Sequence, residues 1–177
     1  MEIFGIFLIA IFVGFITLIK YAEKLELKID ENWNAIVEVI EIKINKTNLI
    51  KEYLDKQIQL TTEELNEVNH TIKRLRLSTA IYLKFDFYIE LNYIIVDLLT
   101  KYESYPQMKI DSTFTEIMLE YDNTDIIESV KNFNDSISKY NTYIEEPIIR
   151  AIIKIFKYKR KKEIGIDIFN NIKRTNR

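Results

Sequence analysis

The sequence predicts an all-α protein, with a single N-terminal transmembrane helix followed by an antiparallel, up-and-down four-helix bundle with long helices. Three observations support this fold class. An uncharged apolar run occupies residues 3–19. After it, apolar residues recur at alternating steps of three and four, which is typical of helices packed side by side, as in coiled coils. Only three Gly and two Pro occur, and none lies between Gly14 and Pro106, whereas β folds need frequent turn residues. The predicted divisions are an anchor (1–20), a bundle (21–147) and a short amphipathic helix with a basic tail (148–177).

Composition bounds the kind of protein before any motif is considered. The 177 residues suffice for one ordinary domain plus an anchor, and 47% of them are hydrophobic and 29% charged, as in folded domains. The net charge of -2 provides no basic field for nucleic acid, so no nucleic-acid partner is expected. The chain has no cysteine, which excludes disulfides, thiolate nucleophiles and cysteine metal sites.

The N-terminal run, Ile3–Ile19, predicts the membrane anchor. Its seventeen residues are at the short end of what crosses a bilayer, and Tyr21 is suited to the interface. A cleavable signal peptide would need a basic start and a cleavage site between small residues. Only Met1 and Glu2 precede the run, and no such site follows it, so an anchor is favoured.

Lysines on one side of the anchor predict its orientation. Lys20, Lys24 and Lys28 follow the run, and no Lys or Arg precedes it. Because the positive flank of a membrane helix stays in the cytoplasm, the N-terminus is expected outside and the bundle inside the cell membrane.

Two helices are predicted in the first half of the soluble part. The first continues from the anchor and has apolar positions at Leu25, Ile29, Trp33, Ile36, Ile40, Ile44, Thr47 and Leu54. The second has Leu65, Val68, Ile72, Leu75, Thr79 and Tyr82. Its start is marked by Thr61-Thr62-Glu63-Glu64, a capping-box pattern.

Two more helices are predicted before Pro147. The third has Leu83, Phe87, Leu91, Ile94, Leu98, Tyr102 and Tyr105, and Pro106 ends it. The fourth has Phe114, Ile117, Tyr121, Ile126, Val130, Phe133, Ile137, Tyr140 and Ile144, with a cap pattern at Thr113 and Glu116 and an end at Glu145-Glu146-Pro147. The step from Tyr121 to Ile126 breaks the period and indicates a local distortion. Such stripes bury against each other, so the aromatic residues are interpreted as core rather than as a cofactor site.

The C-terminal segment combines apolar and basic residues and has two interpretations. Its apolar residues are Ile148, Ile149, Ile152, Ile153, Ile155 and Phe156, interleaved with Arg150 and Lys154. The basic residues that follow are Lys157, Lys159, Arg160, Lys161 and Lys162. This pattern is typical of a helix that binds a membrane surface, and these five residues are the candidates for lipid contact. It is equally typical of a helix that caps the bundle and ends in a solvated basic tail.

The sequence contains no pattern that predicts catalysis. Glu67 and His70 match the Glu-x-x-His of di-iron bundles, but that site needs the motif twice, and His70 is the only histidine. The same count excludes histidine-rich metal sites. No glycine-rich phosphate loop occurs. No enzyme activity, cofactor or metal is therefore expected.

The second half of the chain resembles the LemA family. The segment Glu103-Ser104-Tyr105-Pro106-Gln107-Met108-Lys109 resembles the family's Glu-x-Tyr-Pro-x-Leu-Lys, and Phe114 follows it as a family Phe does. Phe133-Asn134-Asp135 resembles Tyr-Asn-Asp, and Tyr140–Glu145 with Pro147 resembles Tyr-Asn-Thr-x-Ile-Glu followed by Phe-Pro. The match covers residues 91–158. The chain departs from the family at Lys43–Ile50, where the family is Arg-rich, and near Arg74 and Arg76, where the family has Ala-Arg.

The resemblance implies a bacterial, membrane-tethered antiparallel helical bundle and no catalytic residues. Tyr105 and Pro106 are expected to end a helix. Asn134, Tyr140 and Asn141 share one helix flank, and such side chains either bond backbone at a bend or present a polar contact stripe. The expected function is a non-enzymatic scaffold or adaptor of LemA type at the cytoplasmic face, with an unknown protein partner. The alternative is a lipid-binding or membrane-remodelling protein that acts on membrane lipid through its basic tail.

Overall fold

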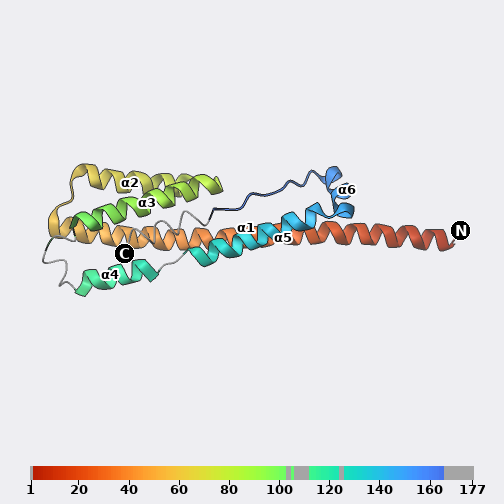
Figure 1. Ribbon diagram of the computed structural model, residues 1–177, viewed down its shortest axis with the longest axis horizontal. Coiled ribbons are helices and arrows are strands. Elements are labelled where there is room, and N and C mark those ends of the chain that lie inside the picture. Colours follow the sequence, from red (N-terminus) through yellow and green to blue (C-terminus); the bar gives the residue numbers. More distant parts are fainter. Residues whose placement is uncertain (1, 103–104, 106–111, 124–125, 166–177) are drawn as a thin grey trace. The chain divides into compact units, whose positions relative to one another are not determined.

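The computed structural model describes residues 2–102, 105, 112–123 and 126–165, and these residues form helices joined by connections, without a strand among them (Figure 1). The helices are α1 (Glu2–Ile58), α2 (Thr62–Leu77), α3 (Ile81–Tyr102), α4 (Ser112–Asn123), α5 (Ile127–Glu145) and α6 (Pro147–Phe156). The all-α class is confirmed. The single four-helix bundle over 21–147 stays a prediction, because the described helices divide between two compact units.

The first unit (unit 1) contains the chain up to Ile36 together with Ile127–Gly165. In it α5 packs antiparallel on the first part of α1. Asn32 Nδ2 donates to the carbonyl of Asn132 at 3.1 Å, and the Tyr143 hydroxyl, further along α5, donates to the carbonyl of Leu18 at 2.8 Å. The apolar stripe predicted for this stretch is buried and comprises Val130, Phe133, Ile137, Tyr140 and Ile144.

The second unit (unit 2) contains Val37–Ile126, in which α2 and α3 form a hairpin of helices. The predicted capping box is confirmed. The Thr61 side chain accepts from the Glu64 N–H at 3.2 Å, and the Glu64 carboxylate accepts from the Thr61 N–H at 2.9 Å. Two of the four N–H groups that a helix leaves unpaired at its start are satisfied in this way.

The buried side of α3 differs from the predicted stripe. Of the predicted stripe, Leu91 and Leu98 are buried but Leu83 is 52% exposed, and Phe85, Tyr88 and Ile95 are buried instead. Tyr82, predicted for the second helix, lies in α3, because α2 ends at Leu77. Apolar residues occur nearly all round this helix. Periodicity then does not identify one face, and the packing partners decide which residues are buried.

The fourth predicted helix is two helices. α4 ends at Asn123 and α5 begins at Ile127, so the predicted continuous helix is wrong at the place where the period breaks. Thr113 is the second residue of α4 and not the residue before it, so the predicted cap is misplaced. α5 ends at Glu145, and Pro147 opens α6 as its first residue, a position where its missing N–H costs nothing. Tyr105 is exposed, and Pro106 lies outside the described residues.

Two buried lysines satisfy carbonyls near helix C-termini within unit 2. Lys43 Nζ donates to the Tyr121 carbonyl at 2.6 Å and lies 3.4 Å from the centre of the Tyr121 ring. Lys84 Nζ donates to the Leu75 carbonyl at 2.7 Å. Burial lowers the pKa of Lys84, and the nearby Glu41 carboxylate opposes that shift. Carbonyls in the last turn of a helix carry partial negative charge and lack intrahelical partners, so both ammonium groups stabilise the ends of α4 and α2.

Candidate functional site

The apolar start of α1 is exposed in unit 1 over most of its length. Phe4, Phe7, Ile9 and Phe12 have exposed fractions between 63% and 69%. A core helix of a soluble protein buries such residues, whereas a membrane helix leaves them to lipid. Within the described residues, α1 is the one helix long and apolar enough to cross a membrane, and its most apolar window is not buried at all. This agrees with the predicted anchor.

One hydrogen bond and two ring contacts bring the end of α5 and the end of α6 to the end of this apolar run. The Tyr143 hydroxyl bonds the Leu18 carbonyl, and its ring meets the Tyr21 ring edge-on at 4.9 Å between centroids. The Phe156 ring lies 5.9 Å from the Phe15 ring. Burial raises the pKa of Tyr143, with further contributions from Glu146 and Tyr21, so its hydroxyl remains a proton donor at neutral pH. The chain thus returns to the point where the apolar run ends.

The short helix α6 has one apolar side that is only partly covered. Ile149 is buried at 4% exposure, whereas Ile148 and Phe156 are 74% and 45% exposed. Arg150 is exposed and lies about 200° around the helix from Ile148, on the opposite side. The side chains of residues 153–155 lie outside the described part. α6 ends at Phe156, and the next residue, Lys157, has a left-handed backbone with φ of 58°, where the chain turns back.

The segment from Tyr158 to Gly165, here called the strap, runs back along α5 without regular secondary structure (Figure 1). Two asparagines of α5 hold it by its main chain. Asn141 accepts from the Lys161 N–H at 2.9 Å and donates to the Lys161 carbonyl at 2.8 Å. Asn134 does the same with Ile164, accepting at 2.8 Å and donating at 2.7 Å. We call these two double hydrogen bonds the asparagine clasps.

The spacing of the clasps follows from backbone geometry. Asn134 and Asn141 are seven residues apart, so they lie about two turns, or about 10.5 Å, apart on one flank of α5. Ile164 and Lys161 are three residues apart, and an extended chain covers about 10 Å in three steps. The two repeats match, so consecutive clasps fit one extended strand running antiparallel to the helix. The structure therefore places both amides on strap backbone, rather than at a bend of α5.

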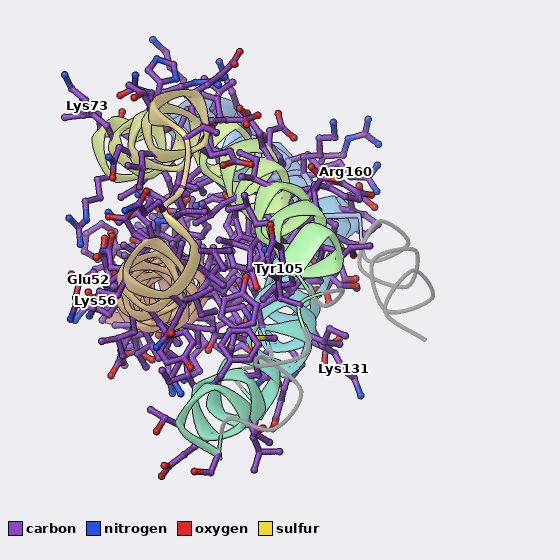
Figure 2. The ribbon with its side chains drawn as sticks, turned by 90° about the vertical axis from the view of Figure 1, so that its left-hand side faces the viewer. Glu52, Lys56, Lys73, Tyr105, Lys131 and Arg160 are labelled. Atoms are coloured by element: carbon purple, nitrogen blue, oxygen red, sulfur yellow. The ribbon has the colours of Figure 1, made fainter. Side chains whose placement is uncertain are left out.

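The five predicted lipid-contact residues do not share one environment. Lys161 is 32% exposed in its side chain, lies 3.0 Å from a Glu26 carboxylate oxygen, and is 5.2 Å from the centre of the Tyr140 ring. Arg160 lies 3.5 Å from a Glu145 carboxylate oxygen, and its side chain is at the outer surface (Figure 2). The remaining three, Lys157, Lys159 and Lys162, are exposed. Lys161 thus faces the helices of unit 1.

Tyr140 lies under the strap between the two clasps. Its side chain is fully buried, and its hydroxyl lies near the Glu26 carboxylate. Burial raises its pKa far above 10, and the adjacent Glu26 carboxylate raises it further. The hydroxyl therefore stays neutral, and the ring supports the strap through its contact with Lys161. The sequence motifs indicate Tyr140 and the two asparagines. They do not indicate that these residues contact the strap, because the strap has no periodicity of its own.

The described residues contain no cluster that could hold a metal ion. Glu67 and His70 are exposed on α2, and no group of three or more His, Asp or Glu in the described ranges could hold a metal ion. A polar groove of about 310 Å³ lies between α1 and α5 in unit 1. It is lined by Leu25, Lys28, Asn32, Asn132, Asp135, Ser136 and Lys139. Its amide, hydroxyl and charged groups can bind a polar group, and the Ser136 hydroxyl donates to the Asn132 carbonyl at 2.9 Å.

A family model supports the resemblance that the sequence motifs indicate. The model described as LemA family matches residues 47–171, which is more than half of the chain. The matched range includes both asparagine clasps and the strap. No curated protein matches the chain.

Proposed function

The chain belongs to the LemA family, and from this premise we propose that it is a non-enzymatic, single-pass membrane protein whose helical body acts as a scaffold or adaptor at the cytoplasmic face. The observation that carries the proposal is the continuity of α1, a single helix from Glu2 to Ile58. The exposed apolar run continues into the packed part of α1 without a linker. The end of α5 contacts the end of this run, where the Tyr143 hydroxyl donates to the Leu18 carbonyl. A folded body attached so directly is held at the membrane surface.

Exposed charges on each unit supply contact surfaces in this proposal. In unit 2, Glu52 and Lys56 of α1 and Lys73 of α2 are exposed, and in unit 1 Lys131 of α5 is exposed (Figure 2). Interspersed charges of both signs favour weak, salt-sensitive and specific contacts with a protein partner over irreversible binding.

The proposed orientation predicts the outcome of single-cysteine labelling. With Glu2→Cys or Glu163→Cys introduced separately, an impermeant maleimide added to intact cells should label position 2 and leave position 163 protected. The chain has no native cysteine, so each signal belongs to one site. Permeabilised cells, where both sites should label, are the control. Labelling at 163 with protection at 2 would reverse the proposed topology.

Partner capture tests the scaffold role itself. A photo-crosslinking residue placed at Ser138, an exposed position on α5, should yield discrete protein adducts in native membranes that weaken severalfold between low and high salt. Lys131→Glu should abolish the adducts that depend on this face, and Lys131→Arg should keep them. If the yield of adducts changes neither with salt nor in Lys131→Glu, the result argues against an adaptor surface on α5.

A second candidate function is lipid binding or membrane remodelling through the basic C-terminal segment. It is favoured by the Phe15–Phe156 contact, which brings the end of α6 and the exposed Lys157 beside the apolar run. A basic residue near an acidic leaflet contributes about 1 kcal/mol.

A further inference from the structure

We propose that α6 lies in the interfacial layer of the same leaflet that the anchor enters, with its exposed apolar side in lipid, and that the strap holds it at this depth. The proposal rests on the proposed function in one respect, namely that the start of α1 crosses a membrane. It assigns the lipid contact to α6 and the turn after it, rather than to the five basic residues as a group.

The depth of α6 follows from its contact with α1. Phe15 lies four residues inside the end of the apolar run at Ile19, which is about 6 Å along the helix axis. The Phe156 ring contacts the Phe15 ring, so the C-terminal end of α6 is at that level. Interfacial helices place their apolar side about 5–10 Å into the boundary between headgroups and acyl chains. The level given by the ring contact falls in this range.

The exposure pattern of α6 fits a lipid layer rather than water. Ile149 packs into unit 1, and Ile148 and Phe156 stay exposed on the same apolar side. At about 100° per residue, Ile148 and Phe156 are about 80° apart, whereas Arg150 is on the opposite side. Exposed branched and aromatic side chains grouped on one side of a helix mark a surface that another apolar phase covers. The apolar run of α1, in contact with the same helix, identifies that phase as the bilayer.

Charge at the end of α6 completes the match with an acidic leaflet. Lys157 and Lys159 are exposed and follow the apolar side directly, where the headgroups would be. Lys161 is paired with Glu26, so its charge is directed at the protein and not at the lipid headgroups. We expect Lys157 and Lys159, rather than Lys161, to set the preference for anionic lipid.

The strap fixes the position of the C-terminal end of α6 relative to α5. The left-handed Lys157 reverses the chain at the end of α6, and the clasps at Asn141 and Asn134 fix the returning segment to α5. Ile164 is buried beneath the second clasp. Both ends of α6 are thereby tied to α5, one by the short connection at Glu146 and the other by the strap. Asn134 and Asn141 are positioning residues in this proposal.

Depth-dependent quenching of the full-length protein in lipid nanodiscs tests the proposal. A small fluorophore is placed on a single cysteine at Ile9, Ile148 or Leu27, each of which is exposed. Lipids carrying a nitroxide high or low on the acyl chain serve as quenchers. The label at 9 should be quenched most by deep nitroxides and the label at 148 by shallow ones. The label at 27, about 12 Å beyond Ile19 along α1, should be quenched by neither.

The outcomes separate this inference from the proposed function. Quenching at 9 together with none at 148 would overturn the seating of α6 and leave the anchor intact. Absence of quenching at 9 would overturn the anchor, and with it both proposals. Shallow quenching at 148 should rise about twofold or more from phosphatidylcholine to phosphatidylserine-containing discs, and Lys157→Gln with Lys159→Gln should remove that increase. A Lys161→Gln variant that alone removed it would contradict the assignment of charges.

Asn134→Ala tests the role of the strap in the same discs. It should reduce the shallow quenching at 148 at least twofold, while the label at 9 stays unchanged. Ser138→Ala, an exposed change on the same helix, is the matched control. Unchanged quenching at 148 in Asn134→Ala would show that the strap does not set the depth of α6.

Discussion

Replacing Phe133 with alanine is expected to lower the free energy of unfolding of unit 1 by about 3 to 5 kcal/mol. The Phe133 side chain is 1% exposed, and its ring lies 5.9 Å from the Trp33 ring, tilted by 54°. Truncation removes apolar area from the contact between α5 and α1 and leaves a cavity that helix backbones cannot close. The lost ring contact with Trp33 adds about 0.5 to 1.5 kcal/mol to the area effect.

The only tryptophan of the chain reports this change directly. Urea unfolding of the full-length protein in detergent, followed by Trp33 fluorescence, should show the midpoint fall strongly in Phe133→Ala. Tyr93→Ala removes an aromatic side chain from a position that is 47% exposed on α3, and it should change stability by no more than about 0.5 kcal/mol. An unchanged midpoint in Phe133→Ala would mean that α5 does not pack on α1 through this face.

Asn134→Ala is expected to release the strap from α5 while the helices stay folded. The substitution leaves the buried N–H and carbonyl of Ile164 without the partners that Asn134 provides. Each buried backbone group left unpaired costs about 1 to 3 kcal/mol. Local opening of the strap should therefore become at least about tenfold more frequent, since about 1.4 kcal/mol corresponds to one factor of ten.

Limited trypsin digestion measures this opening, because the strap carries Lys159, Arg160 and Lys161 and only an opened segment fits a protease. When opening is fast, the cleavage rate follows the population of the open form. Asn134→Ala and Asn141→Ala should each speed cleavage in the strap, while Trp33 fluorescence stays native. Asp135→Ala, at the exposed neighbouring position, should cleave like the unchanged protein. Equal cleavage in all variants would show that the clasps do not hold the strap.

The sequence predicts the elements of this fold best where one face of a helix is polar. Along α5, polar residues separate Val130, Phe133 and Ile137, so the period leaves one stripe to bury, and the structure buries it. The capping box at Thr61 and the break at Pro147 are local devices, and both occur where predicted. The LemA resemblance is confirmed over a longer range than its motifs cover.

Features that depend on distant packing were not predictable in this way. α3 is apolar on most of its surface, so the burial of Phe85 instead of Leu83 is decided by neighbouring helices. The connection between α4 and α5 appears in the sequence only as a missed step in the period. The return of the strap has no periodic signal, because an extended chain held by its backbone places no demand on side-chain order. The five basic residues that follow α6 also differ in their surroundings. Lys161 pairs with Glu26, and this pairing depends on a residue more than a hundred positions away in the sequence.

The asparagine clasps have a consequence for which residues the strap can accept. Both clasps bind only the N–H and carbonyl of Lys161 and Ile164, and these groups are the same in nineteen of the twenty amino acids, leaving proline as the exception. The strap can therefore exchange its exposed side chains widely while its path is kept. Proline at 161 or 164 is the one replacement that no side chain can compensate, because it removes the hydrogen-bond donor itself. The path of the strap depends on Asn134 and Asn141 of α5, so the exposed positions of the strap can diverge while these two asparagines cannot.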